Sequence, residues 1–250
     1  MAERFFLERF VQDQDNEVIL SEEETHHILR VMRKKKGQKI HLLDGSGYIY
    51  EAQIMEQDGK QLRASILSKE FVQKELAKRT VLIQSLCKGE KMDWVVQKAT
   101  ELGVQRIIPI ESDRSDVHYP KNRADNKITR WKKIAQEATK QCGRGIVPDI
   151  DPVESLHSWA KNDLPPQVAL FVSWENEDKR SIQEALDSLP EGIQELWFAV
   201  GPEGGWSPEE IRLLQSRGAI TIGLGKRILR TETAGLLILS SVFYAFGDQT

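Results

Sequence analysis

Length, composition and charge exclude several classes of protein. The chain has 250 residues, of which 40% are hydrophobic and 29% charged, and its net charge is −3; these values are ordinary for a soluble globular protein with one or two domains. No apolar stretch is long enough to cross a bilayer, and the N-terminal residues lack the layout of a signal peptide. Two cysteines are too few for a disulfide framework. We therefore expect a cytoplasmic protein with reduced thiols and no membrane segment.

Residues 1–72 are predicted to form a small domain made mostly of β-strands. Ser21–Glu24 has the sequence of a capping box and begins one short helix that continues through Val31. Asp44-Gly45 and Asp58-Gly59 are typical of hairpin turns. The predicted strands cover residues 39–43, 48–54 and 62–67. We expect a compact barrel of five or six strands, which ends in the charged segment 68–78.

Positive charge is concentrated in two segments although the whole chain is slightly acidic. Residues 30–39 contain six basic residues and no acid, and residues 121–144 contain eight basic residues and two acids. Phosphate binding depends on such local clusters rather than on the net charge. The alternative is that each cluster is only a solvated helix face. Two clusters beside a ligand site favour RNA as the partner.

From Arg79 onward the pattern changes to strands that alternate with helices. The predicted strands cover residues 81–86, 106–110, 168–172, 196–200 and 219–224. The helices are indicated by apolar residues at helical spacing in segments 92–102 and 128–142, and by the N-cap sequence Ser207–Glu210. Such alternation predicts an α/β domain whose parallel sheet is covered by helices on both faces.

The final predicted helix, from Thr231 to Phe246, is apolar nearly all round. A helix of this kind must be buried on most sides. It either packs deep against its own sheet alone or packs against a second subunit as well.

Two glycine-bearing segments follow the last predicted strands and indicate a ligand site. They are Gly201–Gly205, with the sequence Gly-Pro-Glu-Gly-Gly, and Leu224–Ala234. Glycine lets the backbone approach a ligand closely, and loops at the ends of successive parallel strands form the ligand crevice of an open α/β sheet. The first segment matches neither a phosphate-binding loop nor the dinucleotide fingerprint. We expect a crevice for a small polar molecule.

The histidines and cysteines do not indicate a metal site or a nucleophile. His26 and His27 are adjacent, so on a helix their side chains diverge by about 100° and cannot easily share a metal. Packing or RNA contact is the expected role of both imidazoles. Cys87 and Cys142 are interpreted as small buried apolar residues.

The motifs resemble the RsmE family, the 16S ribosomal RNA uridine-N3 methyltransferases of the SPOUT superfamily. Gly201–Gly205 together with Leu224–Ala234 is similar to the cofactor-binding signature of that family. The resemblance extends over the whole chain, and its further motifs are segments 26–33, 88–103, 114–115 and 137–148. It implies a PUA-like RNA-binding β-barrel over residues 1–72 and a SPOUT methyltransferase domain with a deep trefoil knot over residues 73–250. It also implies a homodimer and S-adenosylmethionine as methyl donor.

The resemblance assigns the donor to three segments, 200–205, 222–225 and 228–234, with Leu170–Val172 closing one side. The implied cofactor-binding residues are Leu170, Phe171, Val172, Val200, Gly201, Pro202, Glu203, Gly204, Gly205, Ile222, Gly223, Leu224, Gly225, Ile228, Leu229, Arg230, Thr231, Thr233 and Ala234.

Methylation of uracil N3 requires removal of a weakly acidic imide proton, or stabilisation of the anion that forms. Arg114 and Arg230 are the candidates for stabilising the uracil oxygens, and Glu232 is the candidate general base, with Glu203 second. The alternative for Glu232 is a structural role, because an acid is favoured in the first turn of a helix. The candidate RNA-binding residues are Arg4, His26, His27, Arg30, Arg33, Lys34, Lys35, Lys36, Arg130, Lys132 and Lys133.

Three alternatives stay open at this point. The first is a related SPOUT enzyme that methylates a ribose 2′-oxygen or a transfer RNA. The second is a non-catalytic rRNA-binding assembly factor that kept the fold. The third is an ordinary α/β nucleotide-binding enzyme. Donor binding and the position of the modified nucleoside distinguish them.

Overall fold

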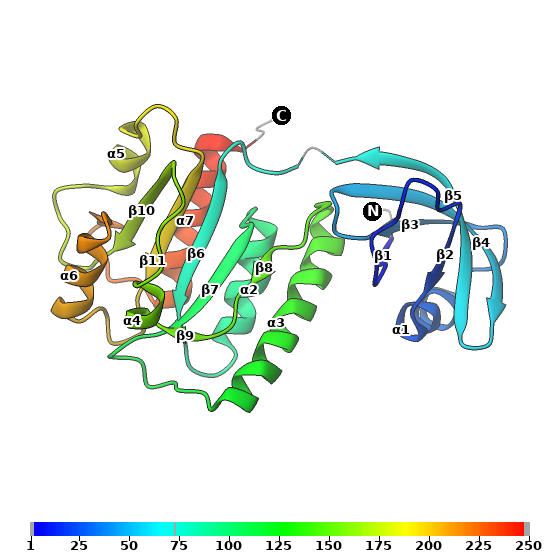
Figure 1. Ribbon diagram of the computed structural model, residues 1–250, viewed down its shortest axis with the longest axis horizontal. Coiled ribbons are helices and arrows are strands. Elements are labelled where there is room, and N and C mark those ends of the chain that lie inside the picture. The colour runs from blue at the N-terminus through cyan, green and yellow to red at the C-terminus, as the bar shows by residue number, and fades with distance from the viewer. Residues whose placement is uncertain (1–2, 73, 248–250) are drawn as a thin grey trace. The chain divides into compact units, whose positions relative to one another are not determined.

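The chain folds into two units in this computed structural model, which describes residues 3–72 and 74–247 (Figure 1). The first unit contains the residues up to Glu75 together with the segment Gln136–Val147. The second contains Leu76–Ala135 and the residues from Pro148 onward. Each unit has its own buried core, so each is described by itself.

A five-stranded sheet forms the first unit, in the order β1-β3-β4-β5-β2. β1 pairs with β3 in parallel, and the other neighbours are antiparallel. The strands are β1 Arg4–Phe6, β2 Glu17–Leu20, β3 Lys39–Leu43, β4 Tyr48–Asp58 and β5 Gln61–Phe71. The three predicted strands are confirmed, although β4 and β5 are longer than their apolar patterns indicated. The Asp58-Gly59 turn also forms as predicted, because Asp58 pairs with Gln61 and Gly59 has a φ of 61°.

The short helix of the first unit changes character half-way along. It begins as the α-helix α1, Glu22–His26, and continues as the π-helix η1, His27–Val31. Ser21 is the N-cap, and its side chain accepts a hydrogen bond from the backbone N–H of Glu24. In the predicted capping box Glu24 would bond back to Ser21. Its carboxylate instead accepts hydrogen bonds from the backbone N–H of Phe6, at 3.0 Å, and from the Lys140 ammonium.

The segment Gln136–Val147 is bound to the first unit by polar contacts that link residues far apart in the sequence. Arg144 is buried and donates to the Glu75 carboxylate from Nε at 2.9 Å. The Arg4 guanidinium donates to the carbonyl of Lys140 at 3.2 Å, near the end of a helix where a cation is favoured. The helix α3, Lys121–Cys142, therefore contributes its last turns to the first unit.

The second unit is built on a parallel sheet in the order β12-β10-β11-β6-β7-β8. Its strands are β6 Arg79–Ser85, β7 Arg106–Glu111, β8 Asp149–Ile150, β10 Val168–Ser173, β11 Glu195–Val200 and β12 Ile220–Ile222, and the short β9 Glu154–Ser155 also pairs with β7. The predicted α/β class and parallel sheet are confirmed. The strand predicted at 219–224 is shorter, and its last residues belong to the cavity loop described below.

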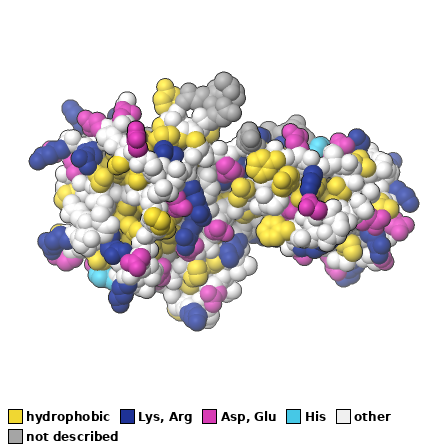
Figure 2. All heavy atoms as spheres, turned by 45° about the horizontal axis from the view of Figure 1, so that its top comes forward, with side chains coloured by type: hydrophobic (Ala, Val, Ile, Leu, Met, Phe, Trp, Pro, Cys, Tyr) yellow, Lys and Arg dark blue, Asp and Glu magenta, His cyan; other side chains and the backbone are white. Residues whose placement is uncertain are grey.

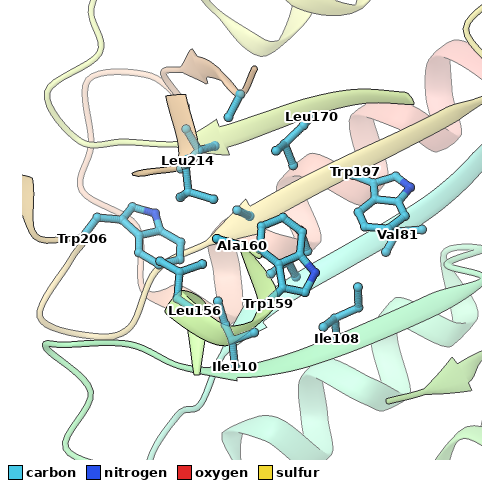
Figure 3. Close-up of a cluster of buried hydrophobic side chains, with 14 of the residues drawn as sticks. Val81, Ile108, Ile110, Leu156, Trp159, Ala160, Leu170, Trp197, Trp206 and Leu214 are labelled. Atoms are coloured by element: carbon cyan, nitrogen blue, oxygen red, sulfur yellow. The ribbon is translucent and has the colours of Figure 1, made fainter. Parts of the chain in front are cut away.

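Helices cover both faces of this sheet, as predicted. The helices of the second unit other than α3 are α2 Lys91–Glu101, α4 Leu156–Trp159, α5 Ile182–Asp187, α6 Pro208–Ser216 and α7 Thr231–Phe246. Alternate strand residues such as Val81 and Ile83 pack against α4 and α6 in one buried cluster (Figure 3). The side chains of Leu82 and Gln84 point to the opposite face, where they lie against Gly235 of α7. The predicted capping box of α6 forms between Ser207 and Glu210.

The apolar helix α7 is buried along one face only. Its inward face contains Ala234, Gly235, Ile238, Leu239 and Val242. Its other side leaves three large side chains exposed in the single chain, namely Leu237, Phe243 and Tyr244. The predicted packing of this helix against its own sheet is thus confirmed. The prediction that the helix is buried on most sides does not hold for a single chain. None of the described helices combines the length and apolarity that a membrane span requires.

Candidate active site

A cavity of about 270 Å³ opens at the carboxyl ends of β10, β11 and β12. The two glycine-bearing segments line it from two sides, since Val200–Trp206 follows β11 and Leu224–Leu229 follows β12. Thr231 and Ala234 of α7 complete the lining. This is the position at which open parallel sheets place a ligand. The predicted crevice therefore exists.

Twelve of the predicted cofactor-binding residues line this cavity: Val200, Gly201, Pro202, Glu203, Gly204, Gly205, Leu224, Gly225, Ile228, Leu229, Thr231 and Ala234. The predicted residues outside the lining are Leu170, Phe171, Val172, Ile222, Gly223, Arg230 and Thr233. Leu170–Val172 is buried inside β10, and the cavity begins at the last residue of that strand, Ser173. The side of the cavity that Leu170–Val172 was expected to close is lined instead by Ser173, Trp174, Glu175 and Glu177.

The Gly201–Gly205 turn is closely packed from both sides, which explains its glycines. A Cβ on Gly204 would lie 2.9 Å from the carbonyl oxygen of Arg114, and one on Gly205 would lie 2.6 Å from Glu175 Oε1. Gly205 also has a φ of 68°, which disfavours any residue with a side chain. Trp206 Nε1 donates to the Ser173 carbonyl at 3.1 Å and fixes the end of the turn. One wall of the cavity is therefore a rigid surface of backbone.

A buried polar network joins this wall to the core. Thr231 Oγ1 donates to the carbonyl of Gly201 at 2.5 Å and accepts from Gln84 Nε2 at 2.9 Å. Gln84 is fully buried in β6, directly after the apolar run Val81–Ile83. A buried amide is costly unless it is hydrogen-bonded. Gln84 thus links the sheet, the start of α7 and the first residue of the glycine turn, and it was not among the predicted site residues.

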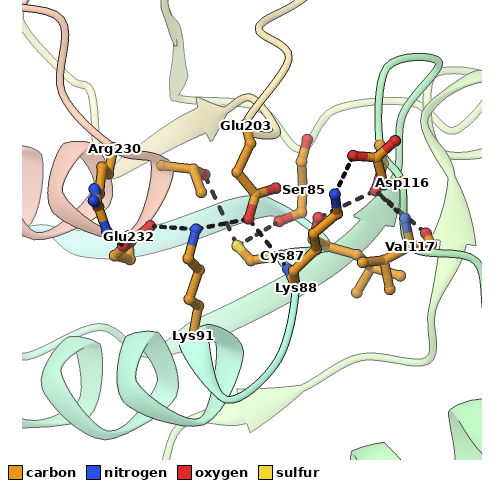
Figure 4. A network of polar contacts seen from close by, with 12 residues as sticks. Ser85, Cys87, Lys88, Lys91, Asp116, Val117, Glu203, Arg230 and Glu232 are labelled. Atoms are coloured by element: carbon orange, nitrogen blue, oxygen red, sulfur yellow. Dashed lines mark hydrogen bonds and ion pairs between the residues drawn. The ribbon is translucent and has the colours of Figure 1, made fainter.

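Two carboxylates share one lysine beside the cavity (Figure 4). Lys91 Nζ donates to Glu203 Oε1 at 2.9 Å and lies 3.5 Å from Glu232 Oε2. The hydrogen bond to Glu203 raises the pKa of Lys91. Burial acts to raise the pKa of Glu203, but the hydrogen bonds from Lys91 and from backbone N–H groups outweigh it, so that this pKa is lowered. Both carboxylates are therefore held next to a permanent positive charge.

Lys91 was also missed from the sequence, although one signal pointed to it. It is the first residue of α2, and a cation is unfavourable at the N-terminal end of a helix. The structure explains the exception, because the two carboxylates Glu203 and Glu232 lie within ion-pair distance there.

None of the three candidate catalytic residues lines the cavity, but each is adjacent to or bonded to a residue that does. Glu232 is in the first turn of α7, and its side chain is 13% exposed. Arg230 is the N-cap of that helix, with a side chain 80% exposed and 4.0 Å from Glu232. Arg114 is exposed beside the glycine turn, and its guanidinium donates to the carbonyl of Gly204 at 3.5 Å. The structure brings Arg230 and Glu232 together and places Arg114 against the glycine turn.

Cys87 is close to this network but is not a nucleophile. It is fully buried, and burial raises the pKa of its thiol to about 12. The thiol therefore stays protonated at neutral pH, as expected for a small buried residue; Cys142 is half-buried. No group of three potential metal ligands occurs among residues 3–72 and 74–247.

The predicted RNA-binding residues differ in how free their charges are. Arg30, Arg33, Lys35, Lys36 and Lys132 are exposed. Lys133 is also exposed, but it interacts with another residue. Lys34 forms an ion pair with Glu3 at 3.1 Å, and Arg130 forms one with Asp93 at 2.7 Å. Arg4 bonds to the carbonyl of Lys140.

The two predicted histidines lie on the same short helix. His26 is exposed, and the ring of His27 packs edge-on against Phe5. On the face seen in Figure 2, basic and acidic side chains are interspersed.

Comparison with known proteins identifies the class first. The family model for the RNA methyltransferase domain matches residues 74–243, and the model for the RNA methyltransferase PUA domain matches residues 20–67. The five-stranded sheet of the first unit and the α/β unit thus match two domains of RNA methyltransferases.

Similarity over the whole length narrows the class to one family. The chain is 33% identical over 247 residues to ribosomal RNA small subunit methyltransferase E of Bacillus subtilis, covering 97% of this chain and 96% of that protein. A crystal structure of the Neisseria gonorrhoeae methyltransferase E bound to S-adenosyl methionine is similar over 100% of both chains, with 31% identity and a TM-score of 0.88. A putative methyltransferase from Legionella pneumophila, in complex with the same cofactor, has 30% identity over 99% of both chains and a TM-score of 0.82. The chain belongs to the RsmE family, as its motifs predicted.

Proposed function

We propose that the protein transfers a methyl group from S-adenosylmethionine to N3 of one uridine in the 16S rRNA of the small ribosomal subunit. The observation that carries this proposal is the cavity, which is walled by the two glycine-bearing segments and flanked by Lys91, Glu203 and Glu232. The relatives named as small subunit rRNA methyltransferases, and the cofactor in two of the similar structures, support it.

The residues around the cavity fit a methyl donor of this kind. The volume of about 270 Å³ is close to the lower end of the range that small-molecule sites occupy, roughly 300–1,000 Å³. Leu224, Ile228 and Leu229 provide apolar surface for an adenine ring, and the glycine turn offers backbone hydrogen-bonding groups. The bound donor supplies a methyl group on a positively charged sulfur.

The chain's own residues bind the uracil and accept its N3 proton. In the proposed mechanism the Glu232 carboxylate accepts the N3 proton, and Glu203 is the second candidate. Arg114 and Arg230 stabilise the negative charge that forms on the uracil oxygens. Lys91 contacts both carboxylates and orients them. Proton removal needs an ionised acceptor, which the lowered pKa of Glu203 and the proximity of Lys91 favour.

RNA binding is assigned to the N-terminal domain, which we propose to be the PUA-like module of residues 1–72, with the methyltransferase domain over residues 73–250. The exposed cations Arg30, Arg33, Lys35 and Lys36 contact phosphates and position the rRNA without reading bases. The uridine is turned out of its stack to reach the cavity.

The finer features implied by the family belong to the same proposal. We propose that the active protein is a cytoplasmic homodimer whose methyltransferase domain contains the trefoil knot of its superfamily. The exposed apolar side chains Leu237, Phe243 and Tyr244 on α7 support a dimer, because a second subunit would remove them from water.

The experiment is donor-dependent methylation of small ribosomal subunits, followed by mass spectrometry of the nucleosides and mapping of the modified base. The expected product is one 3-methyluridine in 16S rRNA. A ribose-methylated product, or methylation of transfer RNA, would show that the target is wrong. Absence of donor binding by calorimetry would favour a non-catalytic assembly factor.

A further inference from the structure

The loop that follows β12 carries unpaired positive charge at the edge of the cavity. Lys226 and Arg227 are exposed, and both line the cavity. Within residues 3–72 and 74–247, neither side chain takes part in a hydrogen bond or an ion pair. Arg230 follows three residues later, with a side chain 80% exposed. Three of the five residues from 226 to 230 are therefore exposed cations.

Charge around the cavity is distributed unevenly. The lining residues that follow β10 include Glu175 and Glu177. Glu203 of the glycine turn also lines the cavity, but Lys91 neutralises its charge. The loop after β12 contributes Lys226 and Arg227. A polyanion that approaches the cavity is repelled from the acidic side and attracted to the basic side. The field around the cavity thus favours one direction of approach.

Three other cations of the second unit are already paired with carboxylates, unlike the two cations of the basic loop. Arg130 is neutralised by Asp93, at 2.7 Å. Lys91 is neutralised by Glu203, at 2.9 Å, and Lys88 by Asp116, at 2.5 Å. Lys226 and Arg227 have no such partner among the described residues, so binding a phosphate does not require an existing pair to break.

We propose that Lys226 and Arg227 bind the phosphates next to the target nucleotide, so that one loop holds the methyl donor through Leu224, Gly225 and Leu229 and the substrate RNA through its two cations. This inference rests on the proposed function and adds a second RNA contact, distinct from the basic cluster of the first unit. Contacts of this kind orient the strand without reading its sequence. They set the position of the turned-out uridine relative to the cavity.

The test is binding of a fluorescent 16S rRNA transcript to the full-length protein saturated with S-adenosylhomocysteine, over a series of salt concentrations. The variant is Lys226→Gln/Arg227→Gln. The control is Lys161→Gln/Lys179→Gln, which removes the same charge from two exposed residues of the second unit that do not line the cavity. We expect the variant to bind RNA about ten-fold more weakly, with a salt slope reduced by between about 1 and 2. The control should bind like the wild type.

Two further measurements distinguish phosphate binding by this loop from donor binding and from self-association. Calorimetry with S-adenosylhomocysteine should give the same Kd for the variant and the wild type. A higher Kd for the variant would mean that the two cations bind the donor, and it would overturn the inference. Sedimentation should give the same oligomeric state, and a loss of self-association would assign the loop to a second copy and overturn it as well.

The RNA titration itself also contradicts the inference if the variant binds as tightly as the wild type. Wild-type protein that binds donor but methylates no rRNA would refute the proposed function instead.

Discussion

The two walls of the cavity both contain glycine, but they differ in how closely other residues pack against them. The Gly201–Gly205 turn is enclosed, because added Cβ atoms at Gly204 and Gly205 would meet Arg114 and Glu175. The loop after β12 is open: Gly225 has a φ of 101° with no atom within 4 Å of an added Cβ, and the Ile228 side chain is 90% exposed. A buried hydrogen bond from Thr231, which Gln84 also contacts, holds the first residue of the enclosed wall.

The difference in packing suits the two walls to different roles in binding. The enclosed wall is preorganised, so binding the donor there costs little ordering of the chain. The open wall leaves its side chains in water until a ligand covers them. Lys91 joins the walls chemically, because it contacts Glu203 in the glycine turn and Glu232 just after the open loop. The predictions below test each part of this description.

The largest effect is expected for Glu232→Gln. Removing the proposed general base should lower kcat by about a hundred-fold and leave the Kd of the donor unchanged. Single-turnover methylation of the ribosomal subunit and calorimetry measure the two quantities. Glu203→Gln is the matched control on the enclosed wall and should lower kcat less. A normal kcat with a lowered melting temperature would instead mean that Glu232 only stabilises the start of α7.

Gly205→Ala tests the enclosed wall. The added Cβ would lie 2.6 Å from Glu175 Oε1 at a φ of 68°, so we expect the donor to bind at least about ten-fold more weakly. Gly225→Ala is the control, since its φ of 101° is also positive but its Cβ meets nothing. Calorimetry should show a much smaller loss of affinity for this control. Equal losses would mean that backbone strain alone, and not the close packing, matters.

Thr231→Val tests the support of the enclosed wall. The substitution leaves the Gly201 carbonyl and the Gln84 amide without their hydroxyl partner, which should lower the free energy of unfolding by about 1–3 kcal/mol. It should also weaken donor binding, because Gly201 is no longer held. Thr231→Ser keeps the hydroxyl and should restore the affinity. A Val variant that is destabilised but binds donor normally would show that the network has only a structural role.

Lys91→Met tests the link between the walls and has the smallest effect on stability. Glu203 has a lowered pKa in the folded protein, so its stabilising contribution is full above the ordinary glutamate pKa of about 4.3 and is lost as the pH falls through the lowered value. The variant lacks this contribution. Its free energy of unfolding should be lower than that of the wild type at pH 7, by less than about 1 kcal/mol because the pair is partly exposed. The difference should disappear at acidic pH.

Denaturant unfolding at several pH values measures this difference. Lys98→Met is the control on the same helix, since it removes an ion pair with Glu101 at 2.8 Å that is remote from the cavity lining. A difference between Lys91→Met and the wild type that does not change with pH would contradict the role given to Lys91.

Local sequence patterns predicted the elements whose causes are local. The capping box of α6 forms because Ser207 and Glu210 are three residues apart, and α7 begins at Thr231 and ends at Phe246 as its apolar run indicated. The cavity was predicted because parallel strands bring their carboxyl ends to one edge of the sheet.

Features that depend on distant contacts could not be predicted in this way. Gln84 appeared only as a polar residue directly after the apolar run Val81–Ile83, and its partner Thr231 lies 147 positions later. The capping-box pattern predicted that the Glu24 carboxylate bonds to the backbone N–H of Ser21. In the folded chain this carboxylate instead accepts a hydrogen bond from Lys140, 116 positions away. The lining residues after β10 were missed because the apolar strand pattern stops at the residue where the cavity begins.

The contribution of residues 136–147 to the first unit limits how the chain can be divided. A fragment cut after residue 72 would retain Glu24, which is buried, while losing the lysine that neutralises it. An isolated buried carboxylate either takes up a proton or destabilises its surroundings. The N-terminal sheet therefore depends on a helix that is synthesised well after the last of its own strands. During translation its charge balance is completed only when the end of α3 has left the ribosome.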